Sequence, residues 1–327
     1  MKALVIGYGS IGKRHIENLS KIPKMKIFVL TTRSYDDFLK TKKCFIVKSI
    51  KSAISHNPDF AIIANETNIH VKFAKILSKA GIHLFIEKPL SDSIRGINEL
   101  SQTTYEKKLV TFMGFNFRFH PGIKIIKKLI TEKKIGKIIS VLVENSSYLP
   151  DWHPNENYTK SYSARKELGG GVVLTSIHEL DYLYWFFGDV KKIVSITEKI
   201  SNLKINVEDS ASIILKFKNN VTAEIHLDYF QRPSSRYCKL IGTEGTIYWN
   251  MNKNEVKIFD IKKKKWLIKK FSKFDYNSMY VEELKHFINC IKNKTHTINN
   301  LKSGVSTLKI ALAVKHASKY GKMVTLK

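Results

Sequence analysis

The sequence predicts an α/β protein with two domains, and three patterns support this prediction. The chain begins with an apolar, partly β-branched segment, Ala3–Ile6, which is followed by closely spaced glycines and a helical pattern. Buried strands then alternate with helices as far as Met113, which is typical of a doubly wound, mostly parallel sheet. From Val190 to Phe271 the chain is a series of strand-like segments, so we expect a second domain with a sheet of its own.

The length of 327 residues allows two hydrophobic cores, and we expect the domains at residues 1–120 and 121–327, with the C-terminal helix near their junction. No apolar run reaches the roughly 18 residues that a membrane span needs. The apolar part of the N-terminus is short and interrupted by glycines, unlike a signal peptide. We therefore expect a cytoplasmic protein without a membrane partner.

Three cysteines are scattered along the chain, at Cys44, Cys238 and Cys290. Their spacing matches neither a metal site nor a disulfide framework, which favours a reducing compartment and no structural metal. A second metal signal is also missing, because the residues after His178 do not form the H-E-x-x-H pattern. We therefore predict no metal cofactor.

The formal net charge of +28 could indicate a nucleic-acid partner. However, the lysines are spread over nearly every segment, and no nucleic-acid-binding module is recognisable. We interpret the charge as a solvated, lysine-rich surface and expect no nucleic-acid partner. A positive field would still favour anionic substrates.

The N-terminal glycines form a dinucleotide-binding fingerprint. Gly7, Gly9 and Gly12 follow a buried strand and open a helix as G-x-G-x-x-G. The first glycine permits the tight turn, the second lets a pyrophosphate approach the backbone, and the third lets the helix pack against the strand. The free N–H groups at the helix start, including those of Ser10 and Ile11, point at the phosphates.

The end of the second strand is the expected contact for the adenosine ribose. An acidic residue is usual there, about 20 residues past the glycines, but this chain has Thr31–Ser34 instead. Without a carboxylate to repel a 2′-phosphate, Thr32 and Arg33 favour NADP slightly over NAD, with Arg33 stacking on adenine or pairing with the phosphate. Alternatively, Arg33 is only a solvated loop residue.

Two further loops follow buried strands of the same predicted sheet. Asn65, Thr67 and His70 lie in the first loop, and Glu87 with Lys88 lies in the second. Ligands of an open parallel sheet bind beyond the carboxyl ends of its strands, so we expect these residues to border the cofactor. Lys88 would then lie where chemistry takes place, unless it is a surface lysine in a turn.

Four features together resemble the Gfo/Idh/MocA family of NAD(P)-dependent oxidoreductases, over essentially the whole chain. They are the glycine motif, Thr67 with His70, Glu87-Lys88-Pro89, and the Gly169–Gly171 run with His178. The resemblance implies a Rossmann domain followed by an α/β domain with a large, mostly antiparallel open sheet. It also implies activity on sugars, inositols and related polyols.

The resemblance implies roles for individual residues as well. Lys88, often placed by a cis bond to Pro89, would hydrogen-bond the reacting oxygen and help to move its proton. His178 would act as general acid and base on the sugar hydroxyl. Asn116 and Arg118 would lie near the cofactor or substrate, although Arg118 is equally consistent with a structural pair across the domain joint.

A helix predicted over Val172–Phe187 places Thr175, His178 and Tyr182 on one face, where they would contact substrate. A histidine on such a helix is often only a core residue, and its catalytic role rests on the resemblance. Thr175 stands where many dehydrogenases of the family have Asp. A hydroxyl cannot supply the charge of a carboxylate, so the proton relay would differ or another group would fill the role.

The long segment from Leu149 to Leu168 is rich in aromatic and basic residues, and long loops of this kind are usually functional. We expect Trp152, Tyr162 and Arg165 to bind substrate, with aromatic faces for a sugar ring and the guanidinium for an anionic group. The alternative is a loop for packing or oligomer contacts. Parts of this loop resemble a branch of the family associated with surface-polysaccharide sugars, including nucleotide-linked ones.

The sequence therefore predicts a hydride transfer between a nicotinamide and a sugar-derived carbon. Two other functions remain open. The first is an enzyme that recycles a tightly bound NAD, for internal redox chemistry or glycoside cleavage, and the second is a non-catalytic dinucleotide-binding regulator. The resemblance also implies a homodimer or homotetramer formed through the open face of the second sheet, where we expect Ile225 and Leu227.

Overall fold

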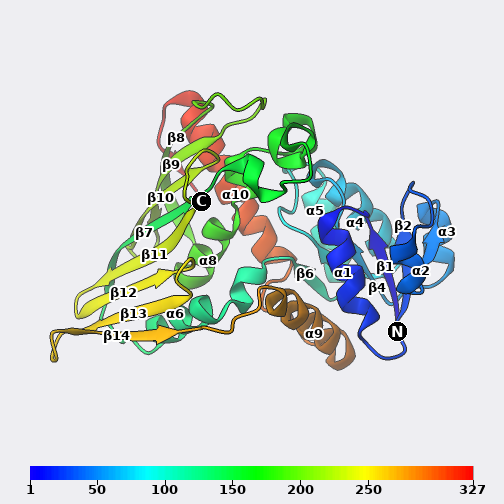
Figure 1. Cartoon of the computed structure of the whole chain (residues 1–327), viewed down its shortest axis with the longest axis horizontal. Helices are drawn as coiled ribbons and strands as arrows, with labels where there is room; N and C mark the ends of the chain where they lie inside the picture. Colours follow the sequence, from blue (N-terminus) through cyan, green and yellow to red (C-terminus); the bar gives the residue numbers. More distant parts are fainter. Residues whose placement is uncertain (327) are drawn as a thin grey trace. The chain divides into compact units, whose positions relative to one another are not determined.

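The computed structural model describes residues 1–326, which form two compact units (Figure 1). The first unit contains residues 1–115 and 277–305, and the second contains residues 116–276 and the chain from Ser306 onward. The chain therefore leaves the first unit slightly earlier than the expected boundary at residue 120. Residues 277–305 belong to the first unit rather than to a continuous second domain.

The first unit is built on a six-stranded sheet with the strand order β3-β2-β1-β4-β5-β6. All neighbouring strands in it are parallel. This order is that of the doubly wound dinucleotide-binding fold, so the predicted Rossmann domain is confirmed. The strands are β1 Lys2–Ile6, β2 Lys26–Leu30, β3 Phe45–Val47, β4 Phe60–Ile63, β5 His83–Ile86 and β6 Thr111–Met113.

Helices cover the sheet of the first unit and bury its strands. Ala3, Leu4 and Val5 of β1 have no exposed surface, because a parallel sheet in this fold is covered on both faces. Phe287 packs edge-on against Phe85 of β5, which attaches the late helix α9 to this sheet. The helices are α1 Ser10–Ser20, α2 Asp37–Thr41, α3 Ile50–Ser55, α4 His70–Lys79, α5 Ile97–Glu106 and α9 Asn277–Asn293.

The second unit contains a nine-stranded sheet with the order β14-β13-β12-β11-β7-β10-β9-β8-β15 (Figure 1). Its pairs are antiparallel except for the parallel pair of β7 and β10, which confirms the predicted mostly antiparallel sheet. The strands are β7 Ile138–Ser146, β8 Val190–Glu198, β9 Ser210–Phe217, β10 Thr222–Asp228, β11 Ser235–Gly242, β12 Gly245–Asn250, β13 Glu255–Asp260, β14 Lys265–Lys270 and β15 Val324–Thr325.

The helix predicted over Val172–Phe187 is wrong as a single element. The chain forms α7 Val172–Thr175 and then α8 His178–Phe187. At the break, the Ser176 backbone leaves helical geometry with ψ at +28°, and the Glu179 N–H donates to the carbonyl of Ser176 at 3.3 Å. This bond spans three residues, as in a 3₁₀ turn, instead of the four residues of an α-helix. The unit also contains α6 Pro121–Thr131, and α10 Leu301–Tyr320 begins in the first unit and continues in the second.

One face of the nine-stranded sheet is open, but it does not carry Ile225 and Leu227 as expected. These two side chains are 3% and 0% exposed, because they lie on the face of β10 that contacts α7. The opposite face presents Val194, Ile196 and Ile214, which are 45%, 63% and 47% exposed. Side chains alternate between the two faces along a strand. The prediction placed Ile225 and Leu227 on the open face of β10, but they lie on its covered face.

Membrane-crossing helices are not found among residues 1–326, because no helix there combines the necessary length with the necessary apolar content.

Candidate active site

The glycine turn between β1 and α1 leaves bare backbone where a phosphate group would approach. Gly7 has φ at +101°, and a Cβ there would lie 2.6 Å from the carbonyl oxygen of Ala64. A Cβ on Gly12 would collide with the carbonyl oxygen of Gly7, whereas a Cβ on Gly9 would meet nothing within 4 Å. The turn is therefore closed behind Gly7 and Gly12 and open beside Gly9, as a bound pyrophosphate requires.

The N-terminus of α1 adds an anion-binding end to this turn. Its first turn contains no acidic residue, and no side chain caps it. The first intrahelical bond from this end is donated by the Lys13 N–H to the carbonyl of Gly9. The N–H groups of Ser10, Ile11 and Gly12 thus precede the helical ladder and remain available to a phosphate. These residues fit a dinucleotide.

The loops after β4 and β5 are held together by His70. Its Nδ1 lies 2.9 Å from the carbonyl oxygen of Pro89, and its Nε2 lies 3.0 Å from that of Asn65. Burial lowers the pKa of this imidazole, which favours the neutral ring. His70 therefore connects the two loops. Because it is only 1% exposed, it stabilises them from within the protein.

Asn65 has the features of a ligand contact in the same loop. Both polar atoms of its side chain are buried, and neither has a hydrogen-bond partner among residues 1–326. Buried polar groups are rarely left unpaired, so this amide is suited to a bound molecule at the carboxyl end of β4. Thr67, two residues further along the chain, is 3% exposed.

Glu87 and Lys88 follow β5 at the same edge of the sheet. The peptide bond between Lys88 and Pro89 is cis, as the resemblance implies. Glu87 is 6% exposed; its Oε1 lies 2.6 Å from Nε2 of His15, and its Oε2 accepts the Lys88 N–H at 3.2 Å. Lys88 is half-buried. The glycine turn and the Asn65 loop therefore flank the point where the strand order reverses, between β1 and β4, and Lys88 follows the adjacent strand β5.

A carboxylate that the sequence prediction did not include, Asp36, lies between β2 and α2, at the N-cap of α2. The guanidinium of Arg33 lies 5.8 Å from the ring centre of Tyr8. The hydroxyl of Tyr8 donates to Asp36, with oxygen separations of 2.7 and 2.8 Å. The Leu39 N–H and this hydroxyl lower the pKa of Asp36. The sequence signal for this carboxylate is Asp36 itself, two residues past the segment Thr31–Ser34.

Thr175 and His178 lie in the second unit, on α7 and α8. They are 5% and 8% exposed, and the His178 ring lies 4.9 Å from that of Phe117. Lys88 and His178, the two predicted proton-handling residues, thus come from different units. Tyr182 is completely buried and packs edge-on against Trp249, so its side chain belongs to the core of the second unit.

Arg118 is engaged in a buried ion pair. Its Nε and Nη2 donate to the two carboxylate oxygens of Asp181 at 2.9 and 2.6 Å, and the two side chains are 2% and 0% exposed. Both residues belong to the second unit. Of the two roles left open by the sequence, this geometry matches the structural one, although the partner lies in the same unit. Asn116 lies close by in the chain, and its buried Oδ1 has no partner among residues 1–326.

Of the three residues predicted to bind substrate from the long loop, Trp152 and Tyr162 lie in 3₁₀ turns, and Arg165 lies between two such turns. The Nε1–H of Trp152 donates to the hydroxyl of Ser147 at 2.9 Å. The guanidinium of Arg165 pairs with Glu167 at 2.6 Å, and both side chains are exposed. Tyr162 is partly exposed. Trp152 therefore already has a partner just before the loop, and Arg165 has one within it.

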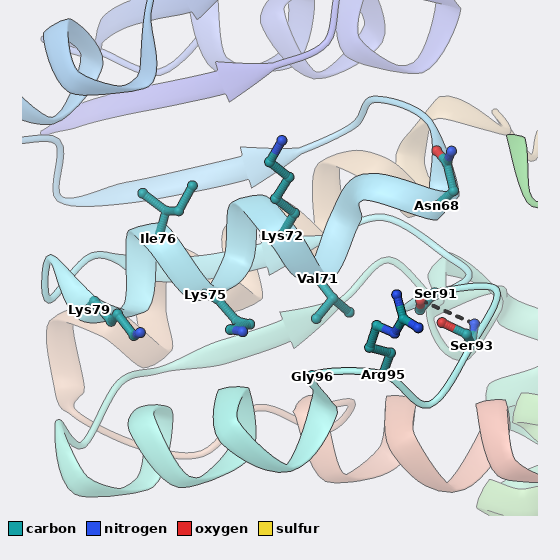
Figure 2. Close-up of a pocket in the computed structure, with 10 residues that line it drawn as sticks. All are labelled: Asn68, Val71, Lys72, Lys75, Ile76, Lys79, Ser91, Ser93, Arg95 and Gly96. Carbon is teal, nitrogen blue, oxygen red and sulfur yellow. Dashed lines mark hydrogen bonds between the residues drawn. The ribbon is translucent and has the colours of Figure 1, made fainter.

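A basic pocket lies elsewhere on the first unit (Figure 2). It has a volume of about 410 Å³ and runs along α4 and the loop after β5, with Lys72, Lys75, Lys79 and Arg95 among its lining residues. Lys75 and Lys79 pair with Glu99 of α5 at 2.5 and 2.9 Å. None of the predicted cofactor residues lines this pocket.

Two family models match the chain, one on each side of residue 120. Residues 1–115 match the oxidoreductase family with an NAD-binding Rossmann fold, and residues 123–248 match the GFO/IDH/MocA C-terminal domain. Among curated proteins, the myo-inositol 2-dehydrogenase of Thermotoga maritima is 26% identical over 345 aligned residues, which cover 100% of this chain and 98% of the relative.

Solved structures share the fold over the full length. A levoglucosan dehydrogenase in complex with NADH superimposes with a TM-score of 0.91 at 17% identity, covering 100% of this chain and 99% of the other. A UDP-N-acetylglucosamine 3-dehydrogenase from Acidithiobacillus ferrooxidans gives a TM-score of 0.81 at 18% identity, with 98% of each chain covered.

Proposed function

Because this chain belongs to the Gfo/Idh/MocA family of NAD-binding oxidoreductases, we propose that it transfers a hydride between a nicotinamide cofactor and a sugar or sugar derivative. The observation that carries this proposal is the junction of β1, β4 and β5. There, a turn open beside Gly9, the unpaired amide of Asn65 and the half-buried Lys88 lie at the ligand-binding edge of a Rossmann sheet.

Different residues of the chain would bind different parts of the dinucleotide. The N–H groups at the start of α1 hold the pyrophosphate, and Asn65 hydrogen-bonds the cofactor beyond β4. When bound, the nicotinamide supplies the hydride acceptor or donor.

We propose NAD(H) as the natural cofactor. A carboxylate near the adenosine ribose repels a 2′-phosphate, and the carboxylate of Asp36, held by Tyr8 next to Arg33, is suited to this role. A solved relative also contains NADH. The expectation that favoured NADP lacks support from that complex.

Lys88 and His178 would handle the proton. The ammonium of Lys88 would hold the reacting oxygen and exchange its proton, and the imidazole of His178 would act as general acid and base. Thr175 precedes His178 in place of a carboxylate and would orient a substrate hydroxyl through its own hydroxyl group. These roles follow from the family resemblance and the half-buried position of Lys88.

The substrate class is a polyol or sugar, because relatives are named for myo-inositol, levoglucosan and UDP-N-acetylglucosamine. Trp152 and Tyr162 offer aromatic surface for a sugar ring. Arg165 would recognise an anionic group only after exchanging its pairing with Glu167. A nucleotide-linked sugar is the more specific form of this proposal.

A substrate panel tests the proposal. Purified protein is incubated with NAD⁺ or NADP⁺ and, separately, with myo-inositol, scyllo-inositol, levoglucosan or UDP-N-acetylglucosamine, and the reduced cofactor and oxidised sugar are quantified. We expect equal amounts of both products with at least one substrate. Product without net reduction of the cofactor would instead identify a recycled NAD, and NADH binding without any turnover would identify a regulator.

We also propose that the open face of the nine-stranded sheet binds a second copy of this chain. Val194 and Ile214 are neighbours in register on β8 and β9, and with Ile196 they form an exposed apolar surface. Native mass spectrometry should show a dimer or tetramer, and Ile214→Lys should shift it to monomer. A wild-type protein that is monomeric at micromolar concentration would refute this part.

A further inference from the structure

Three ionisable side chains meet inside the first unit, away from solvent. His15 comes from α1, Glu87 from the loop after β5, and Glu283 from α9. They are 0%, 6% and 0% exposed, and one ligand atom of each lies within 4.8 Å of the others. Residues so distant in the chain converge because α1 and α9 both contact the aromatic face of β5. The His15 ring lies 5.0 Å from Phe85, and Phe287 of α9 packs on the same ring.

Glu87 is the centre of this triad and is held from several sides. Its Oε1 lies 2.6 Å from Nε2 of His15, and its Oε2 accepts the Lys88 N–H at 3.2 Å. A Cβ on Gly114 would lie only 2.8 Å from Oε2, so the backbone after β6 closes the remaining side. The Glu87 carboxylate thereby links α1 directly to the backbone of Lys88.

Glu283 is the member of the triad without an assigned task. Neither of its carboxyl oxygens, nor Nδ1 of His15, has a hydrogen-bond partner among residues 1–326. Burial, together with the negative charge of Glu87, raises the pKa of Glu283 well above its ordinary value. A carboxyl group in that state is neutral and has a hydrogen to donate. The polar groups that lie beside it are Glu87 and His15, and the ring of Tyr280 packs edge-on against the ring of His15.

The same residue types could ligate a metal ion, but the geometry favours a direct hydrogen bond between His15 and Glu87, with Glu283 beside them. Ligands of a tetrahedral zinc ion at about 2.1 Å from the metal lie roughly 3.4 Å apart. The separation of 2.6 Å between His15 Nε2 and Glu87 Oε1 is that of a direct charge-assisted hydrogen bond.

We propose that Glu283 is a positioning residue for Lys88: from its buried place beside His15 and Glu87, it completes a His15–Glu87–Glu283 triad that fixes the Glu87 carboxylate and, through it, the Lys88 backbone. The inference rests on the proposed function, in which Lys88 handles the proton. Glu283 does not touch the reacting atoms and acts only through Glu87.

Three variants test this inference. Glu283→Gln keeps a neutral hydrogen-bonding side chain, Glu283→Leu removes it at similar volume, and Glu282→Gln makes the same change at the exposed neighbouring position. The first readout is amide hydrogen exchange of the Lys88 N–H in the NADH complex. The second is the split between kcat and KM with whichever panel sugar turns over, measured across pH.

We expect Glu283→Leu to speed exchange of the Lys88 amide by about tenfold and to lower kcat by about ten- to a hundredfold, with the KM for NAD⁺ nearly unchanged. Glu283→Gln should restore both readouts to within about twofold of wild type and keep the same pH profile. Glu282→Gln should match wild type. Rescue by the neutral isostere separates positioning from simple packing.

Several results would overturn the inference. Wild-type exchange at Lys88 in Glu283→Leu would show that the triad does not hold this backbone, and damage in Glu283→Gln equal to that in Glu283→Leu would show that the ionised form is required. Should Glu283→Leu fail to fold, Glu283→Gln alone decides through its exchange rate and pH profile. Stoichiometric zinc in the purified protein, lost in Glu283→Gln, would also overturn it. Full activity of Lys88→Ala would refute the proposed function, whereas the exchange readout tests the triad without turnover.

Discussion

Replacing Asp181 by Asn should strongly destabilise the second unit. Arg118 and Asp181 are 2% and 0% exposed and form two short hydrogen bonds, so Asp181→Asn leaves a buried guanidinium without its counter-charge. Breaking one partner of such a pair costs about 3–5 kcal/mol. A unit of this size loses about 2–4 °C in Tm per kcal/mol, so we expect a fall of roughly 6–20 °C.

Urea and thermal unfolding followed by circular dichroism measure this change. The double variant Arg118→Met with Asp181→Leu should be less destabilised than Asp181→Asn, because it removes the unpaired charge. Asp189→Asn is the matched control: its pair with Lys218 has both side chains more than half exposed, so it should cost less than about 1 kcal/mol. An Asp181→Asn protein with an unchanged Tm but a raised KM for the sugar would refute the structural role of the Arg118–Asp181 pair. It would indicate that Arg118 contacts substrate.

Three further predictions concern the first unit. Gly12→Ala should lower both Tm and NADH affinity because its Cβ collides with Gly7. Gly9→Ala should keep the wild-type Tm but lose about tenfold or more in NADH affinity, since its Cβ points into the open space where the pyrophosphate would bind. Equal effects of the two variants on Tm would contradict this prediction. Asp36→Asn should improve the affinity for NADPH relative to NADH by about tenfold in fluorescence titrations, and an unchanged ratio would remove Asp36 from cofactor selection. Because the pKa of Glu283 is raised, the folded state holds a proton that the unfolded state releases above about pH 4.5. Wild type should therefore lose stability relative to Glu283→Gln as pH rises from there, by up to about 1.4 kcal/mol per pH unit. The same pH dependence of urea unfolding in both proteins would refute this prediction.

The first unit was predictable from sequence because its signals are local. The glycine turn follows a strand and opens a helix within residues 3–19, and the periodicity of each strand and helix can be read independently of the others. The loops with Asn65 and Lys88 then follow from the rule that ligands bind beyond the carboxyl ends of parallel strands. Asp36 was not predicted because it lies past the segment Thr31–Ser34, and its contact with the hydroxyl of Tyr8 forms only in the folded chain.

The second unit exposed the limits of local patterns. The break at Ser176 has no glycine or proline to signal it, and the parity of Ile225 on β10 depends on register with β9 and β7. Arg118 was placed near the cofactor or substrate from the family resemblance and Tyr182 from its helical spacing to His178, but their burial depends on long-range partners. Glu283 was only one residue in a helical pattern until α9 was placed against β5.

The most direct test of the central claim is turnover by Lys88→Ala beside wild type and Lys263→Ala, a control in the exposed turn between β13 and β14. With NAD⁺ and a panel sugar, we predict wild-type NADH formation in the control and a loss of at least about a hundredfold in kcat for Lys88→Ala, with NADH still bound. Equal NADH formation by Lys88→Ala and wild type would contradict the account.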